Sequence, residues 1–375
     1  MLTTLVFRVS AQEELKKKET PLDSFPTISL QEVKLTGIRA KQNTPVTFTN
    51  VTQKDIASRT LGQDIPLLLN YLPAVVTTSD AGAGIGYTGI RVRGSDATRV
   101  NVTLNGIPYN DAESQGTFWV NLPDFASSIQ QIQLQRGVGT STNGSAAFGA
   151  SLNVETSGVQ QDAFTSLSSS IGSFNTLKNT FQFSSGVLND NFSFSGRLSK
   201  INSDGYIDRA ASNLDAYFFQ AAFQDNNTLS KALIFGGHEV TYQSWYGVDA
   251  QTLVTSRTYN PAGEIYDSSG NLTGFYDNQV DDYTQDHYQL HWDEKINSIW
   301  SVSLGLNYTY GRGFYEEYND LWQDQNISFV GNTSFNYLQL DPYNIGETSI
   351  ESSENILLPS TGFSINLKYL LPKVW

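Results

Sequence analysis

The sequence contains no cysteine, which excludes a disulfide scaffold, a thiolate metal site and a cysteine nucleophile. It also lacks any apolar run of about 18 residues, so no transmembrane helix is expected, and a membrane protein of this composition would have to be a barrel. Basic residues are scarce, since 23 Lys and Arg stand against 37 Asp and Glu for a net charge of -14. Because phosphate binding needs clustered Lys and Arg, nucleic acid is not expected as a partner.

What the chain does contain favours strands and turns. Its 375 residues, enough for two domains, include 30 Gly, 19 Tyr and 21 Phe. After Ser157 the sequence becomes a series of segments of about ten residues in which apolar and polar side chains alternate. In Trp300–Tyr310, for example, Trp, Val, Leu and Tyr fall on one face, and Ser, Gly, Asn and Thr on the other.

This alternation fits a strand that lies between lipid and water, although the strands of a soluble β-sandwich alternate too. The connections favour the first interpretation. Some are short, such as 188–190, whereas 244–282 and 314–361 are long. Short turns at one rim and long loops at the other are typical of outer-membrane barrels.

The region before these strands is predicted to be mixed α/β. Thr52 followed by Asp55 predicts a capping box at a helix start. Further short helices are expected in 61–72 and 124–129. Asn105-Gly106 stands between two apolar runs, which predicts a β-hairpin.

The motifs that usually carry chemistry are weak in this chain. Gly84, Gly86 and Gly89 match a dinucleotide fingerprint, but a strand-like segment follows where a helix is needed. His287 and His291 share a strand face, where a metal site is conceivable and a wet barrel wall is the plainer interpretation. We predict no cofactor and no metal site. Without a nucleophile and base arrangement, the chain is not expected to be an enzyme.

Three phrases occur in order between Leu69 and Thr156: "LNYLPAVVTTSDAGAGIGYTGIRVRG", "RVNVTLNGIPYND" and "NLPDFASSIQQIQLQRGVGTSTNGSAAFGASLNVET". Together they resemble the plug domain of TonB-dependent outer-membrane receptors. The resemblance implies an α+β plug domain followed by an antiparallel transmembrane β-barrel. The barrel is expected to be incomplete, because such transporters have roughly 22 strands and we count about eight strand-like segments after the plug. The chain is therefore expected to be a fragment that transports nothing by itself.

The expected domains follow from this resemblance. They are a signal-peptide remnant at 1–11, a flexible tether with a TonB box at 12–43, the plug at 44–157, and the N-terminal part of the barrel at 158–375. The first segment ends in Val9-Ser10-Ala11, which fits a small-residue cleavage site, although a frayed N-terminus is the alternative.

The resemblance also implies roles for charged residues of the plug. Arg91, Arg93 and Arg136 match the family's plug arginines and are expected to contact the barrel. Gln130 and Gln133 stand where the family usually has Glu, so a charge latch built from those two positions is not expected.

The phrase "QEVKLTGIRA" resembles a TonB box. The residues expected to bind TonB are Glu32, Val33, Lys34, Leu35 and Thr36. An extended segment on a flexible tether can add as a strand to a partner's sheet, and pulling on it could then remodel the plug. The alternative is that this segment is an ordinary first strand of the plug.

The function that the resemblance implies is import of a scarce ligand across the bacterial outer membrane, energised by TonB and its inner-membrane complex. A ferric siderophore is the expected ligand, and outer-membrane lipid is the expected surroundings. Tyr87, Tyr109, Phe118 and Trp119 could stack on a flat ligand, or could pack between plug and barrel. Import of a glycan, cobalamin or another nutrient is an alternative, and a soluble β-rich adhesin or binding module is an alternative of another class.

Overall fold

The computed structural model describes residues 3–8, 39–41, 43–138, 147–267, 269–297, 300–319, 349–352 and 362–369. No helix in these ranges combines the length and the apolar character that crossing a bilayer requires. The predicted TonB-binding residues 32–36 lie outside the described residues.

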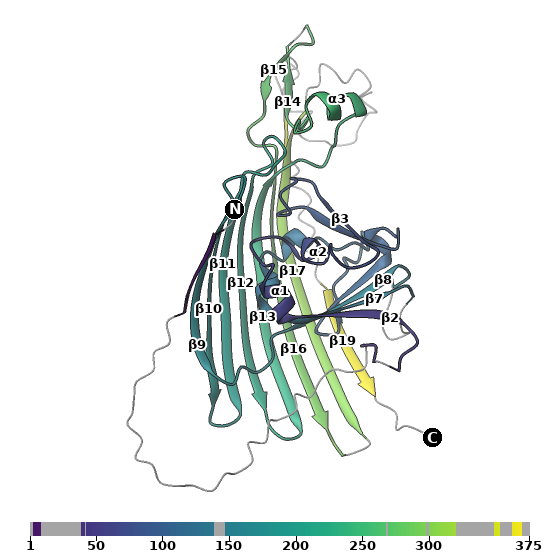
Figure 1. Ribbon diagram of the computed structural model, residues 1–375, viewed down its shortest axis with the longest axis vertical. Coiled ribbons are helices and arrows are strands. Elements are labelled where there is room, and N and C mark those ends of the chain that lie inside the picture. Colours follow the sequence, from purple (N-terminus) through teal and green to yellow (C-terminus); the bar gives the residue numbers. More distant parts are fainter. Residues whose placement is uncertain are drawn as a thin grey trace, which may run out of the picture.

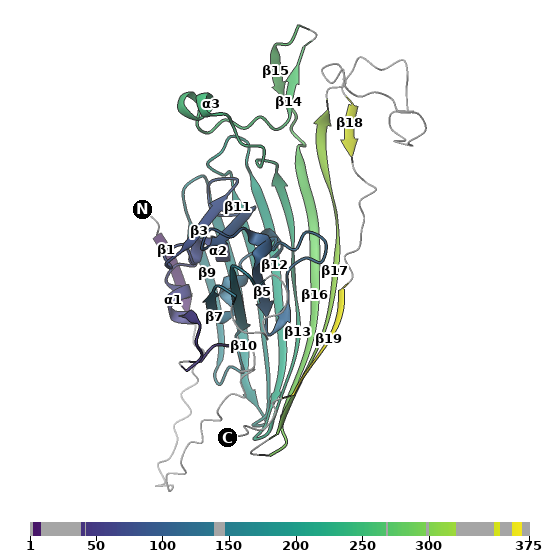
Figure 2. The same ribbon diagram turned by 90° about the vertical axis from the view of Figure 1, so that its right-hand side faces the viewer.

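A large antiparallel sheet forms a curved wall (Figure 1, Figure 2). It has ten strands in the order β1-β9-β10-β11-β12-β13-β16-β17-β18, with β19 also paired to β17. The strands are β1 (Thr3–Arg8), β9 (Ala163–Ile171), β10 (Leu177–Leu188), β11 (Phe192–Ser203), β12 (Ser212–Gln224), β13 (Thr228–Tyr242), β16 (Val280–Lys295), β17 (Ser301–Asn319), β18 (Ser349–Ser352) and β19 (Gly362–Tyr369). Within the described ranges this sheet is barrel-like but does not close on itself.

The two faces of this sheet differ as the alternation predicts. On β16 the outward side chains Tyr288, Leu290 and Trp292 are exposed, while His287 and His291 on the other face are buried. The prediction that both histidines share the inner face is therefore confirmed, and both are buried there. The His287 ring lies 5.3 Å from that of Tyr109 in the smaller domain.

The smaller domain lies in the concave side of the wall (Figure 2). Its sheet has the order β2-β7-β8-β5-β6, in which β5 and β8 are parallel, and β3 pairs separately with β4. The elements are β2 (Thr47–Thr52), α1 (Gln53–Ala57), α2 (Ile65–Leu68), β3 (Val75–Ser79), β4 (Thr88–Val92), η1 (Ala97–Arg99), β5 (Val100–Leu104), β6 (Ile107–Pro108), η2 (Trp119–Asn121), η3 (Phe125–Ser128), β7 (Ile129–Arg136) and β8 (Ala150–Thr156).

Local sequence signals of this domain hold in the structure. Thr52 and Asp55 form the predicted capping box of α1. Asn105 and Gly106 have φ values of 53° and 82°, which gives the left-handed two-residue turn between β5 and β6. The helix expected in 124–129 is instead the short 3-10 helix η3, because β7 begins directly after it at Ile129.

The long connection after β13 extends beyond the rim of the wall. It carries α3 (Ala250–Thr255), β14 (Glu264–Tyr266) and β15 (Leu272–Phe275), which lie above the strands (Figure 1). At the opposite rim the links are short, for example from Gln224 to Thr228. The predicted asymmetry of the two rims is present for the connection after β13, whereas most of the second expected long connection, 314–361, lies outside the described residues.

The expected domain boundary and the expected signal-peptide remnant remain proposals. The boundary between the domains at 157 and 158 falls between the end of β8 and the start of β9. The segment proposed as a signal-peptide remnant contains β1, which pairs along β9 from Thr3–Ile171 to Arg8–Ser166.

Candidate functional site

The smaller domain and the wall share one hydrophobic core. Phe125 of η3 packs on Phe235 of β13 at 5.1 Å and on Phe218 of β12 at 6.2 Å between ring centroids. All three side chains are buried. The inner face of the wall is therefore apolar where it meets η3, which holds the domain there by exclusion of water.

A buried ion cluster lies beside this apolar contact. Asp124 Oδ1 is 2.5 Å from Lys178 Nζ on β10, and Asp124 Oδ2 is 3.3 Å from Arg197 Nη1 on β11. The three side chains are 0%, 4% and 2% exposed. Asp124 has a φ of 50°, a left-handed conformation that Asp tolerates better than most residues. One carboxylate of the smaller domain thus joins two neighbouring strands of the wall.

Hydroxyl groups complete the surroundings of Asp124. Thr180 donates to Oδ2 at 2.8 Å, and Ser199 donates to the same oxygen at 2.5 Å. Burial alone would raise the pKa of Asp124, but the charges of Lys178 and Arg197 hold that pKa well below its ordinary value. The carboxylate is therefore ionised throughout the physiological pH range.

The contact with β16 is of a different kind. Asn105 Nδ2 donates to Gln289 Oε1 at 3.2 Å, and the Tyr109 hydroxyl donates to Gln285 Oε1 at 3.3 Å. These are neutral hydrogen bonds of near-maximal length. Each contributes less than a charge-assisted bond.

Nearer the long loops, Tyr87 links the domain to the rim. Its hydroxyl donates to the carboxylate of Asp281 on β16, and its ring meets Trp245 edge-on at 5.2 Å. Burial, with the nearby Glu239 and Asp281, raises the pKa of Tyr87. The phenol therefore keeps its proton and acts as a donor.

The four aromatic residues predicted to meet a ligand have different positions. Tyr87 and Tyr109 pack between the domain and β16, which is the alternative role left open for them. Trp119 is 2% exposed, so its ring cannot stack on a ligand in this conformation. Phe118, at 44% exposed, is the one of the four with a freely accessible ring.

The arginines predicted to contact the barrel are placed elsewhere. Arg136 donates to the carbonyl of Pro73 at 2.9 Å and to Thr49 at 3.0 Å, both within the smaller domain. Arg91 and Arg93 are exposed. Among the described residues none of the three forms a hydrogen bond or ion pair with a wall strand, so their contact with the barrel stays a prediction. In the ion cluster between the two parts, the cations Lys178 and Arg197 belong to the wall, and the acid, Asp124, belongs to the smaller domain.

The start of the domain is fastened to its own sheet. Arg39 forms an ion pair with Glu155 of β8, and Gln133 of β7 exchanges two hydrogen bonds with the backbone of Ala40 at 2.8 and 3.1 Å. Gln133 thus has a role that a glutamate could not fill, because only an amide can both donate and accept here.

The glycine-rich run does not have the surroundings of a nucleotide site. Gly84 and Gly86 have φ values of 76° and 89°, and the segment that follows them is strand β4. A dinucleotide fingerprint needs a helix there. The run is a loop at the side of the domain that faces the long connections (Figure 2).

Comparison with known proteins agrees with this arrangement. Residues 40–151 match the family described as TonB-dependent Receptor Plug Domain. The chain therefore contains a plug domain of the TonB-dependent receptors. The smaller domain is their plug, and the large sheet corresponds to strands of their barrel.

The curated relatives that match this chain are named as vitamin B12 transporters. The vitamin B12 transporter BtuB of Vibrio cholerae serotype O1 is 23% identical over 308 residues, which cover 80% of this chain and 48% of the transporter. The chain thus spans about half the length of the curated relatives that it matches.

Solved structures share the fold. The ferric-catecholate import receptor Fiu from E. coli K12, in its closed form, matches with a TM-score of 0.57 at 16% identity over 77% of this chain and 40% of that one. The siderophore receptor PiuA from Acinetobacter baumannii matches with a TM-score of 0.56 at 12% identity over 76% and 39%.

Proposed function

We propose that this receptor chain belongs to an importer of a scarce ligand in the bacterial outer membrane, energised by TonB. The observation that carries the proposal is a plug held on the concave face of an antiparallel sheet whose other face exposes many large apolar side chains. Such a sheet suits lipid outside and a filled lumen inside.

A ferric siderophore is the proposed ligand. Its support is a group of aromatic side chains that borders the plug loop 80–88. Trp245 and Tyr246 are 40% and 50% exposed, with ring centroids 6.3 Å apart, and Trp245 contacts Tyr87. Exposed aromatic rings bind flat or apolar ligand groups. The matching siderophore receptors favour the same ligand class.

Cobalamin is the second candidate, because the curated relatives are vitamin B12 transporters. The same aromatic rim would serve either ligand. The choice between them therefore needs a transport measurement.

The proposed TonB-binding segment, Glu32–Thr36, lies a few residues before the fastened start of the plug. A pull on this segment reaches Arg39 and Ala40 first. The bond from Arg39 to Glu155 then transmits the force to β8, and the bonds between Ala40 and Gln133 transmit it to β7. In this proposal these bonds couple TonB to the plug.

The test is uptake by cells that express the receptor gene encoding this chain as their only such receptor. Radiolabelled ferric siderophore and cyanocobalamin are supplied separately. Val33→Pro removes a backbone N–H needed for strand addition and is expected to abolish uptake of the true ligand. Asp23→Pro, in the tether, is the matched control and is expected to leave uptake unchanged.

The outcomes separate the alternatives. Loss of iron uptake in Val33→Pro alone supports the siderophore proposal, and loss of cobalamin uptake alone replaces it with the second candidate. Uptake of either ligand that survives Val33→Pro, or no uptake of either, contradicts a TonB-energised importer of these ligands.

A further inference from the structure

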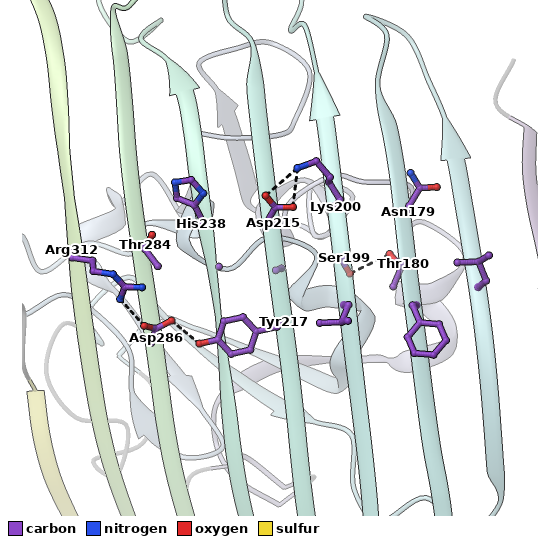
Figure 3. A pocket seen from close by; sticks show the side chains of 15 residues that line it. Asn179, Thr180, Ser199, Lys200, Asp215, Tyr217, His238, Thr284, Asp286 and Arg312 are labelled. Atoms are coloured by element: carbon purple, nitrogen blue, oxygen red, sulfur yellow. Dashed lines mark hydrogen bonds and ion pairs between the residues drawn. The ribbon is translucent and has the colours of Figure 1, made fainter.

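The outer face of the wall contains an open groove of about 530 Å³. It lies across β9 to β13, β16 and β17, on the side away from the plug (Figure 3). Its apolar part is formed by Leu167, Phe181, Leu198 and the ring of Tyr217. Its polar part is formed by Asn179, Lys200, Asp215, His238, Thr284, Asp286 and Arg312.

The strand register places this groove where the outer face changes from apolar to polar side chains. One row of outward residues across the wall is Phe181, Leu198, Tyr217, Gly236, Asp286 and Tyr310. The next row toward the long loops is Asn179, Lys200, Asp215, His238, Thr284 and Arg312. The next row toward the short turns is Phe183, Gly196, Phe219, Ile234, Tyr288 and Tyr308. The outer face therefore changes from apolar to polar within one row, and the groove lies across that change.

The cations of the groove are positioned by their neighbours. Arg312 Nη1 donates to Asp286 at 2.7 Å, and Asp286 also accepts from the Tyr217 hydroxyl at 2.6 Å. The Asp286 side chain is 14% exposed, whereas Arg312 is 45% exposed. The guanidinium is thus held through Nη1, and much of the rest of the group is accessible from outside the wall.

Lys200 is held in the same way. Its ammonium contacts both oxygens of Asp215, at 3.0 and 3.1 Å, and is 49% exposed. Figure 3 shows this pair and the Arg312 pair on either side of the ring of Tyr217. Two cations with accessible N–H groups therefore flank an apolar floor.

From this geometry we propose that the groove binds the phosphate-bearing headgroup of a membrane lipid, whose acyl chains run down the apolar rows below it. Arginine and lysine N–H groups bind phosphate oxygens with charge-assisted hydrogen bonds. The floor of Phe181, Leu198 and Tyr217 continues into the apolar rows, which supplies the path for the chains.

The same charges argue against a free phosphate ion as the occupant. Lys200 and Arg312 are balanced by Asp215 and Asp286, so the groove has little net charge with which to attract a soluble anion. A lipid gains additional free energy from its chains, which the apolar rows cover. This inference depends on the proposed function in one respect: it assumes that the outer face of the wall lies against membrane lipid.

The test uses the full chain in dodecyl maltoside micelles, titrated with dimyristoylphosphatidylglycerol, with bound lipid counted by native mass spectrometry. The double variant Lys200→Gln with Arg312→Gln is expected to bind this lipid about tenfold or more weakly, because it loses both charge-assisted contacts. The variant Lys200→Arg with Arg312→Lys keeps both cations and is expected to retain binding, provided that both variants fold alike. Arg257→Gln, an exposed loop cation away from the groove, is the control.

Three results would overturn the proposal. They are equal binding by the double glutamine variant, equal binding of a phosphate-free diacyl galactolipid, and displacement of the lipid by millimolar inorganic phosphate. Uptake assays are separate from this measurement, so failure of the importer proposal leaves a positive lipid result in place, and the reverse also holds.

Discussion

Asp124→Asn tests the contact that fixes the plug to the wall. The substitution keeps the size of the side chain but leaves Lys178 and Arg197 buried, at 4% and 2% exposed, without a negative charge between them. Removal of one partner from a buried ion pair costs about 3–5 kcal/mol. Because Thr180 and Ser199 can still donate to the amide oxygen, we expect the lower end, about 3 kcal/mol, or roughly a hundredfold shift toward the undocked plug.

Hydrogen–deuterium exchange of the full chain in detergent micelles measures this shift. The peptide that contains η3 is expected to exchange about a hundredfold faster in Asp124→Asn than in the parent, if exchange requires the plug to leave the wall. Glu113→Gln, which removes an exposed acid of the same domain, is the control and should exchange like the parent. Equal exchange in Asp124→Asn and the control would refute the reasoning.

A second substitution separates charge from packing. Adding Lys178→Met to Asp124→Asn removes one of the uncompensated cations and is expected to restore part of the protection. If the double variant is instead worse than the sum of the single variants, the loss in Asp124→Asn comes from altered packing and not from buried charge.

The pH dependence follows from the low pKa of Asp124. The folded pKa lies below the ordinary value of 3.8, so this carboxylate contributes stability that is fully present above pH 3.8 and is lost as the pH falls through the folded pKa. The ion cluster should therefore keep the plug docked at pH 5. In Asp124→Asn that acid-dependent step should be absent.

Two further predictions concern the plug itself. Asn105→Ala leaves the buried N–H of Thr156 without its acceptor and is expected to cost about 1–3 kcal/mol, as chemical denaturation can measure. Asp64→Asn should raise the melting temperature at pH 7. Burial raises the pKa of Asp64, so the folded state retains a proton and stability falls as the pH rises above 3.8 toward the folded pKa; Asp64→Asn removes that slope.

Periodic and local signals of the sequence predicted most of the fold. Apolar and polar side chains alternate along 300–310 and 287–292, which indicated the outward faces of β17 and β16. In a strand whose two faces meet different surroundings, successive side chains point to opposite faces. The capping box at Thr52 and the turn at Asn105 held because both depend on residues within three positions of each other. Signals of this range do not require knowledge of the tertiary fold.

The ion cluster could not be predicted in the same way. Its acid and its bases come from different domains, and Arg197 follows Asp124 by 73 positions. One signal was available. Arg197 lies on the inner face of β11, whose other inner residues are four serines and Ile201, so a charge there needs a buried partner. For Arg136 the resemblance gives the residue but not its neighbours, and among the described residues its partners are Pro73 and Thr49.

The two attachments of the plug differ in strength, and this difference predicts where remodelling begins. The η3 side combines the Phe125 core contact with the Asp124 ion cluster. The β16 side has no ion pair to the plug among the described residues: it has neutral hydrogen bonds, such as Asn105 to Gln289, worth about 1 kcal/mol each, and the single bond from Tyr87 to the Asp281 carboxylate. A pull that enters the plug through Arg39 should therefore release the β16 side first. Because the chain has no cysteine, one engineered pair can be joined selectively with a short bifunctional maleimide. A crosslink between Asn105→Cys and Gln289→Cys is expected to block uptake, while one between Ser127→Cys and Gln182→Cys, across the η3 side, is expected to permit it. The opposite result would mean that the plug leaves the wall from the Asp124 side, and that its strongest contact is the one that TonB breaks.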